Sequence, residues 1–231
     1  MKLDDNHIIQ LQKYGIVNNL MKYFSLDNLE AAYHNLLGKE IKHINKSILR
    51  NDLDDIAIEA KVTKINNIYT TLNDLYFELV NHSYFPRAST RVLIPKTNGK
   101  QRPLGLPSFR DKIVQSIMSD ILISVYEPVF LDCSHGYREN RGCHTALKNF
   151  KNVINSNIYT YIVEADIQGF FDNISHQHLL NFINHIIKDK YFLMYIKRFL
   201  EAGVLDSSDN FKYIATQAGT PQGRFNFSTF S

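Results

Sequence analysis

The chain has 231 residues, 44% of them hydrophobic and a net charge of +3, which suits a globular protein with one sizeable core or two modest domains. Its two cysteines, Cys133 and Cys143, form no CxxC pair, which argues against a zinc site or a disulfide framework. No signal core and no run of ~20 apolar residues occurs, so we expect a cytoplasmic protein with no membrane partner.

The first eighty or so residues are predicted to be helical. Asn28 is expected to open one helix, and the acidic run at 51–55 opens another, because acids are favoured at the positive end of a helix dipole. Apolar residues then recur near helical spacing as far as Leu79. Pro86 ends this region.

A β-hairpin is predicted next. Two extended runs, 91–94 and 101–106, flank the pair Asn98-Gly99, which is the strongest local hairpin signal because both turn residues need positive φ. Pro95 and Pro103 favour edge strands for both runs, since proline cannot donate to a ladder.

Positive charge is concentrated around this hairpin. Residues 86–112 hold seven Lys and Arg side chains against the single acid Asp111, whereas the rest of the chain is slightly acidic. Such a cluster attracts polyanions such as nucleic acids or nucleotide phosphates. The alternative interpretation is a solvated surface loop.

The remainder alternates helices with one strand. Ser108 is expected to cap a helix that runs to Pro128, because isoleucines recur on one face behind it. Ser175 is expected to cap another helix, whose apolar stripe is core packing. The other predicted elements are a short helix at 145–153, a strand at 158–165 and a helix at 191–200.

Asp166 is the most informative single residue. A lone carboxylate ends an apolar strand there, and Gly169, Phe170 and Phe171 follow within five positions. Two-metal phosphoryl transfer needs such a ligand, because Mg²⁺ prefers carboxylate oxygen. The alternative is a strand-end aspartate that caps the next turn. Asp172 is interpreted as a residue at the start of the following helix.

Several blocks in a fixed order together resemble the bacterial reverse transcriptases of the group II intron type. The resemblance covers roughly residues 84–223, and its order and spacing are more specific than any single block. The blocks are 94–107 with 110–115, 127–130 with 134–146, 164–172, 202–205 and 219–223.

This resemblance implies an α+β fold: the fingers and an incomplete palm of a right-hand polymerase, preceded by a helical N-terminal region. The implied boundaries are 1–85 for the helical region, 86–157 for the fingers and 158–231 for the partial palm. The implied activity is RNA-directed DNA polymerisation by a two-metal mechanism, with Mg²⁺ as the cofactor.

The resemblance also assigns roles near the reacting atoms. Asp166 would be the first metal-binding carboxylate, and the Ile167 backbone carbonyl would help to hold the second metal. Phe171 would pack under the incoming sugar and exclude a 2′-hydroxyl. Lys96 and Arg102 would grip the triphosphate.

The same resemblance implies contacts to the template. Gln222 would touch the pair formed by the incoming nucleotide and the template. Arg110, Arg138 and Arg141 would contact the template backbone, with surface ion pairs as the alternative for all three.

The chain departs from the family pattern after Gly223. The expected Tyr-x-Asp-Asp hairpin is absent, and Asp54-Asp55 precedes the Asp166 strand and cannot replace it. One carboxylate alone would bind Mg²⁺ weakly or not at all, because the ion needs several oxygen ligands. We therefore expect a truncated polymerase that is inactive by itself.

The predicted function is that of a reverse transcriptase fragment. Its expected partners are an RNA template, a DNA primer, deoxynucleoside triphosphates and an intron RNA. Two alternatives stay open: a non-catalytic nucleic-acid-binding remnant, and a relative that serves defence or CRISPR spacer acquisition.

Overall fold

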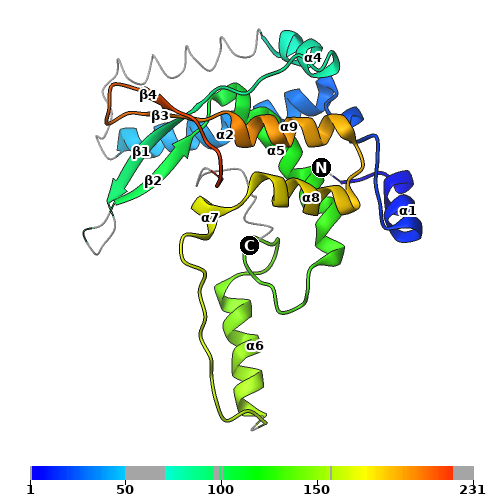
Figure 1. The fold of residues 1–231 in the computed structure, drawn as a ribbon, viewed down its shortest axis with the longest axis vertical. Coiled ribbons are helices and arrows are strands. Elements are labelled where there is room, and N and C mark those ends of the chain that lie inside the picture. The colour runs from blue at the N-terminus through cyan, green and yellow to red at the C-terminus, as the bar shows by residue number, and fades with distance from the viewer. Residues whose placement is uncertain (1, 50–70, 96–98, 100, 157, 221–231) are drawn as a thin grey trace.

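The structure, a computed structural model, describes residues 2–49, 71–95, 99, 101–156 and 158–220. A layer of packed helices carries a small sheet at one end, and one helix projects away from this body (Figure 1). No helix in these ranges is long and apolar enough to cross a membrane. The helix predicted to open at 51–55 lies outside the described residues.

The described helices follow one another over most of the chain and confirm the mixed α and β content expected from the sequence. Helix α1 is capped by Asp4 at its N-terminus and by Gly15 at its C-terminus. The helices are α1 (Asp5–Tyr14), η1 (Leu20–Tyr23), α2 (Leu26–Leu49), α4 (Leu72–Val80), α5 (Phe109–Tyr126), η2 (Glu127–Val129), α6 (Cys143–Asn155), α7 (Phe170–Asn173), α8 (His176–Ile186) and α9 (Lys190–Glu201).

The sheet has four strands in the order β2-β1-β3-β4. Strands β1 (Ser89–Pro95) and β2 (Gln101–Leu106) form the predicted antiparallel hairpin, with Gly99 at φ +77° in its turn. Strands β3 (Val204–Asp206) and β4 (Lys212–Ile214) were not predicted, and β3 pairs in parallel with β1.

The expectation of two edge strands is half right. Strand β2, with Pro103, is an edge, but β1 lies between β2 and β3. Pro95 is tolerated because β3 reaches only the first part of β1, where Ser89 pairs with Val204. The far end of β1 therefore needs no donor on that side.

Helix α5 forms the centre of the core. Ser108 caps it as predicted, since the Ser108 hydroxyl oxygen accepts a hydrogen bond from the Asp111 amide at 3.1 Å. Ile113, Ile117 and Ile121 are fully or nearly fully buried. Helix α2 packs on α5, and α8 packs on α9 (Figure 1). The predicted caps and stripes thus place the main helices correctly.

The strand predicted at 158–165 is not formed. This segment leads from α6 back toward α7 in extended form, and no strand pairs with it within the described residues (Figure 1). Its apolar side chains are open to solvent, with Tyr161 88% and Val163 90% exposed. The prediction is wrong because a strand needs a neighbour for its backbone groups, which sequence alone does not supply.

A buried carboxylate joins the start of α5 to the segment that enters the sheet. Asp111 is 1% exposed. It accepts hydrogen bonds from the Tyr84 hydroxyl at 2.5 Å, the Ser108 hydroxyl at 2.7 Å and the Arg87 amide at 3.2 Å. Burial, and next the charge of Asp111, raise the pKa of Tyr84 far above its usual range. Tyr84 therefore stays a neutral donor at any ordinary pH.

Tyr84→Phe should lower the free energy of unfolding by about 1–3 kcal/mol, because it leaves a buried acceptor without one of its donors. Urea unfolding followed by circular dichroism measures this change. Tyr159→Phe is the matched control, since Tyr159 is 70% exposed, and should have no effect. Equal stability of both variants would contradict a structural role for the Tyr84 hydroxyl.

Candidate functional site

A cavity of about 180 Å³ lies where the sheet meets α7. All four strands contribute to its wall, as does the segment that precedes Pro221. Its walls combine one basic side chain, one acidic side chain, and mostly small or apolar residues. The lining residues are Arg91, Pro103, Leu104, Gly105, Asp172, Val204, Ile214, Thr216, Ala218, Gly219 and Thr220.

Helix α7, which carries Phe171, lies directly against the segment 218–220. The amide of Thr220 donates to the Phe171 carbonyl at 2.7 Å, and the amide of Gly219 donates to the Ile174 carbonyl at 2.8 Å. The Phe171 ring is half-buried and packs edge-on against Phe170, with ring centres 5.4 Å apart. Two segments of the predicted nucleotide site are thus side by side, although about 50 positions separate them.

The hairpin brings a third predicted segment to the same cavity. Arg102 lies on β2, paired through its backbone with Ile94, and the next residues of β2 line the cavity wall. Lys96 and Gln222 lie outside the described residues. Gln222 follows two positions after Thr220, which the Phe171 carbonyl holds.

Asp166 and Ile167 are both exposed, and Ile167 is 68% open to solvent. Within the described residues, no group of three or more His, Cys, Asp or Glu side chains could hold a metal ion. One carboxylate and one carbonyl supply too few of the roughly six oxygens that Mg²⁺ requires. The described residues thus do not complete a Mg²⁺ site.

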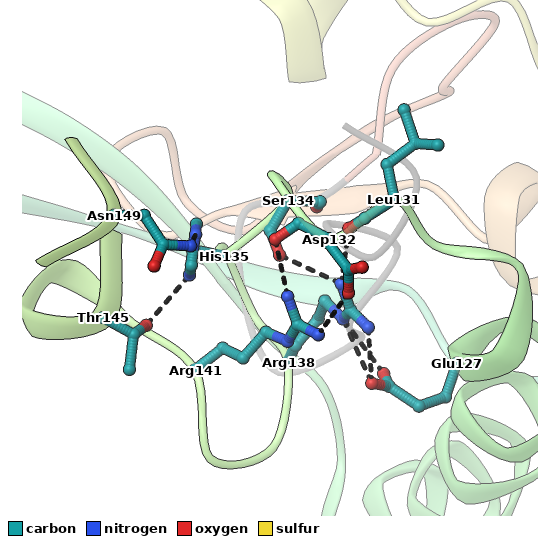
Figure 2. Close-up of polar contacts among 9 residues, drawn as sticks. All are labelled: Glu127, Leu131, Asp132, Ser134, His135, Arg138, Arg141, Thr145 and Asn149. Atoms are coloured by element: carbon teal, nitrogen blue, oxygen red, sulfur yellow. Dashed lines mark hydrogen bonds and ion pairs between the residues drawn. The ribbon is translucent and has the colours of Figure 1, made fainter. Parts of the chain in front are cut away.

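The loop between η2 and α6 is held together by Arg138 (Figure 2). Its guanidinium donates to both carboxylate oxygens of Glu127 at 2.7–3.2 Å, and to the carbonyls of Leu131 at 2.8 Å and Ser134 at 3.0 Å. Arg138 is 9% exposed, and its hydrogen bonds to Glu127 raise its pKa further. Most of its donors are therefore used inside the protein.

Arg141 is held more loosely in the same loop. It donates to the carbonyl of Asp132 at 2.7 Å and to its carboxylate at 3.0 Å, and the Asp132 side chain is 98% exposed (Figure 2). Arg110 pairs with Glu78 at 2.6 Å and lies over the Tyr84 ring. All three arginines predicted to contact the template thus have ion-pair partners, and their template role stays a prediction.

Asp172, which the sequence predicts at the start of a helix, is also a cavity residue. It is the third residue of α7 and faces the same space as Arg91 on β1. The prediction of a helix-start residue is confirmed, because Asp172 lies in the first turn of α7, although Gly169 and not Asp172 is the residue that precedes the helix. The hydrogen bonds between α7 and 218–220 hold Asp172 beside the sheet, and no local sequence pattern signals that contact.

Comparison with known proteins gives a consistent picture. A family model described as reverse transcriptase (RNA-dependent DNA polymerase) matches residues 94–227. The group II intron-encoded protein LtrA of Lactococcus lactis subsp. cremoris is 44% identical over 194 residues, which is 84% of this chain and 30% of LtrA.

Two further relatives extend this comparison. An uncharacterised 91 kDa protein in the cob intron of Schizosaccharomyces pombe is 42% identical over 213 residues, 90% of this chain and 24% of that protein. The protein YkfC of Escherichia coli is 34% identical over 149 residues, 63% of this chain and 38% of YkfC. The chain thus spans a quarter to two fifths of the length of these curated relatives.

Arg138 and Arg141 should respond differently to alanine substitution. Arg138→Ala removes the internal partner of Glu127 and of two carbonyls, so hydrogen exchange of residues 131–142 should become faster. Arg141→Ala is the matched control in the same loop and should change exchange much less, because its partner is exposed. Mass spectrometry of peptides from the loop measures both, and equal effects would refute the distinction.

Proposed function

We propose that this chain, which belongs to the reverse transcriptase (RNA-dependent DNA polymerase) family, holds the template and the incoming nucleotide in an RNA-directed DNA polymerase of the group II intron type. The convergence of β2, α7 and 218–220 on one cavity supports this proposal. Each of these segments carries or leads into a residue for which the sequence predicts a nucleotide contact.

The proposed architecture is that of a right hand. Residues 86–157 would be the fingers, 158–231 part of the palm, and 1–85 a helical N-terminal region. The parallel pairing of β1 with β3 supports this arrangement, because it fixes the basic hairpin against the later part of the chain. The orientation of the hairpin relative to α7 is thereby fixed, because residues 218–220, which follow β3 and β4, are hydrogen-bonded to α7 and the residue after it.

In the proposed reaction, the 3′-hydroxyl oxygen of the primer bonds to the α-phosphorus of a deoxynucleoside triphosphate, and pyrophosphate leaves. Lys96 and Arg102 would neutralise the triphosphate, which is the main demand of phosphoryl transfer. The Phe171 ring would block a 2′-hydroxyl on the incoming sugar. Gln222 would contact the nucleotide paired with the template.

The proposed partners are an RNA template, a DNA primer and deoxynucleoside triphosphates. An intron RNA is a further proposed partner, because LtrA, a 44% identical relative, is a group II intron-encoded protein. Arg110 and Arg141 are better placed than Arg138 to reach a template backbone, since Arg138 is 9% exposed and bonded within its loop. We propose that Arg138 shapes the loop that presents Arg141.

A non-catalytic nucleic-acid-binding role is the second candidate. The observation that favours it concerns Asp166, whose side chain is exposed and belongs to no group of three or more His, Cys, Asp or Glu side chains in the described part of the chain. The basic hairpin would bind nucleic acid in either case, so binding alone does not separate the two functions.

Replacing Lys96, Lys100 and Arg102 by alanine should weaken binding of a primer–template duplex and flatten its salt dependence. The slope of log affinity against log salt should fall by about 2–3, because each lost phosphate contact removes nearly one unit. Fluorescence anisotropy at several salt concentrations measures the slope. The charge-matched control is Lys13, Lys188 and Lys197→Ala, three exposed lysines that lie outside the hairpin. An identical slope in both triple variants would refute the hairpin as the binding surface.

Asp166→Asn should leave folding and duplex affinity of this chain unchanged to within about 0.5 kcal/mol, because the side chain is exposed. In a chimera that continues the chain with the remainder of a group II intron-encoded relative, the same change should abolish primer extension. Phe171→Ala in that chimera should keep activity and admit ribonucleotides. Full primer extension by the Asp166→Asn chimera would contradict a metal-binding role and favour the alternative, an aspartate that caps a turn.

A further inference from the structure

The contact between α7 and 218–220 is closed by a histidine. His176, the first residue of α8, is 9% exposed, and its Nε2 lies 2.7 Å from the Gly219 carbonyl oxygen. Since a carbonyl can only accept, Nε2 carries the proton and donates. Both the neutral Nε2–H tautomer and the imidazolium make this bond, so it does not depend on the charge of the ring.

The peptide groups of Gly219 have partners on both sides. Its amide donates to the Ile174 carbonyl, and its carbonyl accepts from His176. Ser175 and Ala218 form an antiparallel bridge next to it. The orientation of this stretch of backbone is therefore fixed by three consecutive residues that follow α7.

The backbones approach too closely for any side chain at Gly219. Its φ is +81°, and a Cβ atom there would lie 2.8 Å from the carbonyl oxygens of both Phe171 and Asp172. Glycine is thus required for its conformation and for the close approach to α7. The same approach lets the Thr220 amide reach the Phe171 carbonyl at 2.7 Å.

We propose that His176 is a positioning residue that sets the sugar discrimination of the nucleotide site. It couples α7, which carries Phe171, to residues 218–220, so that these two segments move as one unit. The His176 ring would touch neither nucleotide nor template. This inference rests on the proposed function, in which Phe171 contacts the incoming nucleotide.

The coupling is tested first without any nucleotide, in the full chain. His176→Ala should increase the hydrogen exchange rates of the Gly219 and Thr220 amides about five- to tenfold, and should also expose the Asp172 and Asn173 amides of α7, measured by NMR. His176→Gln keeps an N–H donor of similar reach and should restore protection. His178→Ala, an exposed histidine of the same helix, is the control. Unchanged rates at Gly219 and Thr220 in His176→Ala would overturn the proposal.

The consequence for specificity is tested by binding of dUTP and UTP, which differ only in the 2′-hydroxyl, to the chain with an annealed primer–template, measured by saturation-transfer NMR. His176→Ala should reduce the preference for dUTP at least several-fold, as Phe171→Ala should, whereas His176→Gln should retain it. A full dUTP preference in His176→Ala, despite lost amide protection, would refute the positioning role. Failure of the unaltered chain to bind either nucleotide would count against the proposed function, and the exchange rates would then decide the coupling by themselves.

Discussion

The buried carboxylate of Asp111 is the interaction on which the arrangement of sheet and helices depends. A charge that is 1% exposed is tolerated only when donors surround it, and here they come from Tyr84, Arg87 and Ser108. Arg198 of α9 holds the same stretch from the other side, through the carbonyls of His82 and Tyr84. The connection from α4 to β1 is thus hydrogen-bonded to both α5 and α9. These bonds fix the point at which the basic hairpin leaves the helical core.

The direction of that hairpin then decides which segments meet at the candidate site. Because β1 pairs with β3, the chain after α9 returns along the sheet and delivers 218–220 to α7. The cavity therefore depends on contacts between residues about fifty to more than one hundred positions apart. The charge proposed to attract a nucleic acid and the ring proposed to select the sugar of the incoming nucleotide come from different parts of the chain, and both are attached to the same helical core.

Local signals in the sequence predicted the local structure well. The β1–β2 hairpin, the caps at Ser108 and Ser175 and the buried face of α8 each depend on residues within a few positions, and the structure confirms them, although Phe182 of the predicted stripe is 54% exposed. Strands β3 and β4 were missed because each has only three residues and is stabilised by its partners rather than by propensity. Residues 158–165 have the apolar composition of a strand, but no partner strand pairs with them within the described residues. The hydrogen bond between His176 and Gly219 likewise has no local sequence signal, because the two residues are far apart in the chain.

The three arginines show why site residues are harder to predict than helices. A sequence presents Arg110, Arg138 and Arg141 as equivalent positive charges, each able to bind a phosphate. Their environments differ. Arg110 lies over an aromatic ring beside Glu78. Arg138 is enclosed by carbonyls and Glu127, whereas Arg141 pairs with an exposed aspartate. An enclosed guanidinium would have to break several hydrogen bonds to reach a template, whereas a guanidinium paired with an exposed carboxylate exchanges partners at little cost. Availability of the donors, rather than charge, therefore ranks these residues as proposed contacts for nucleic acid.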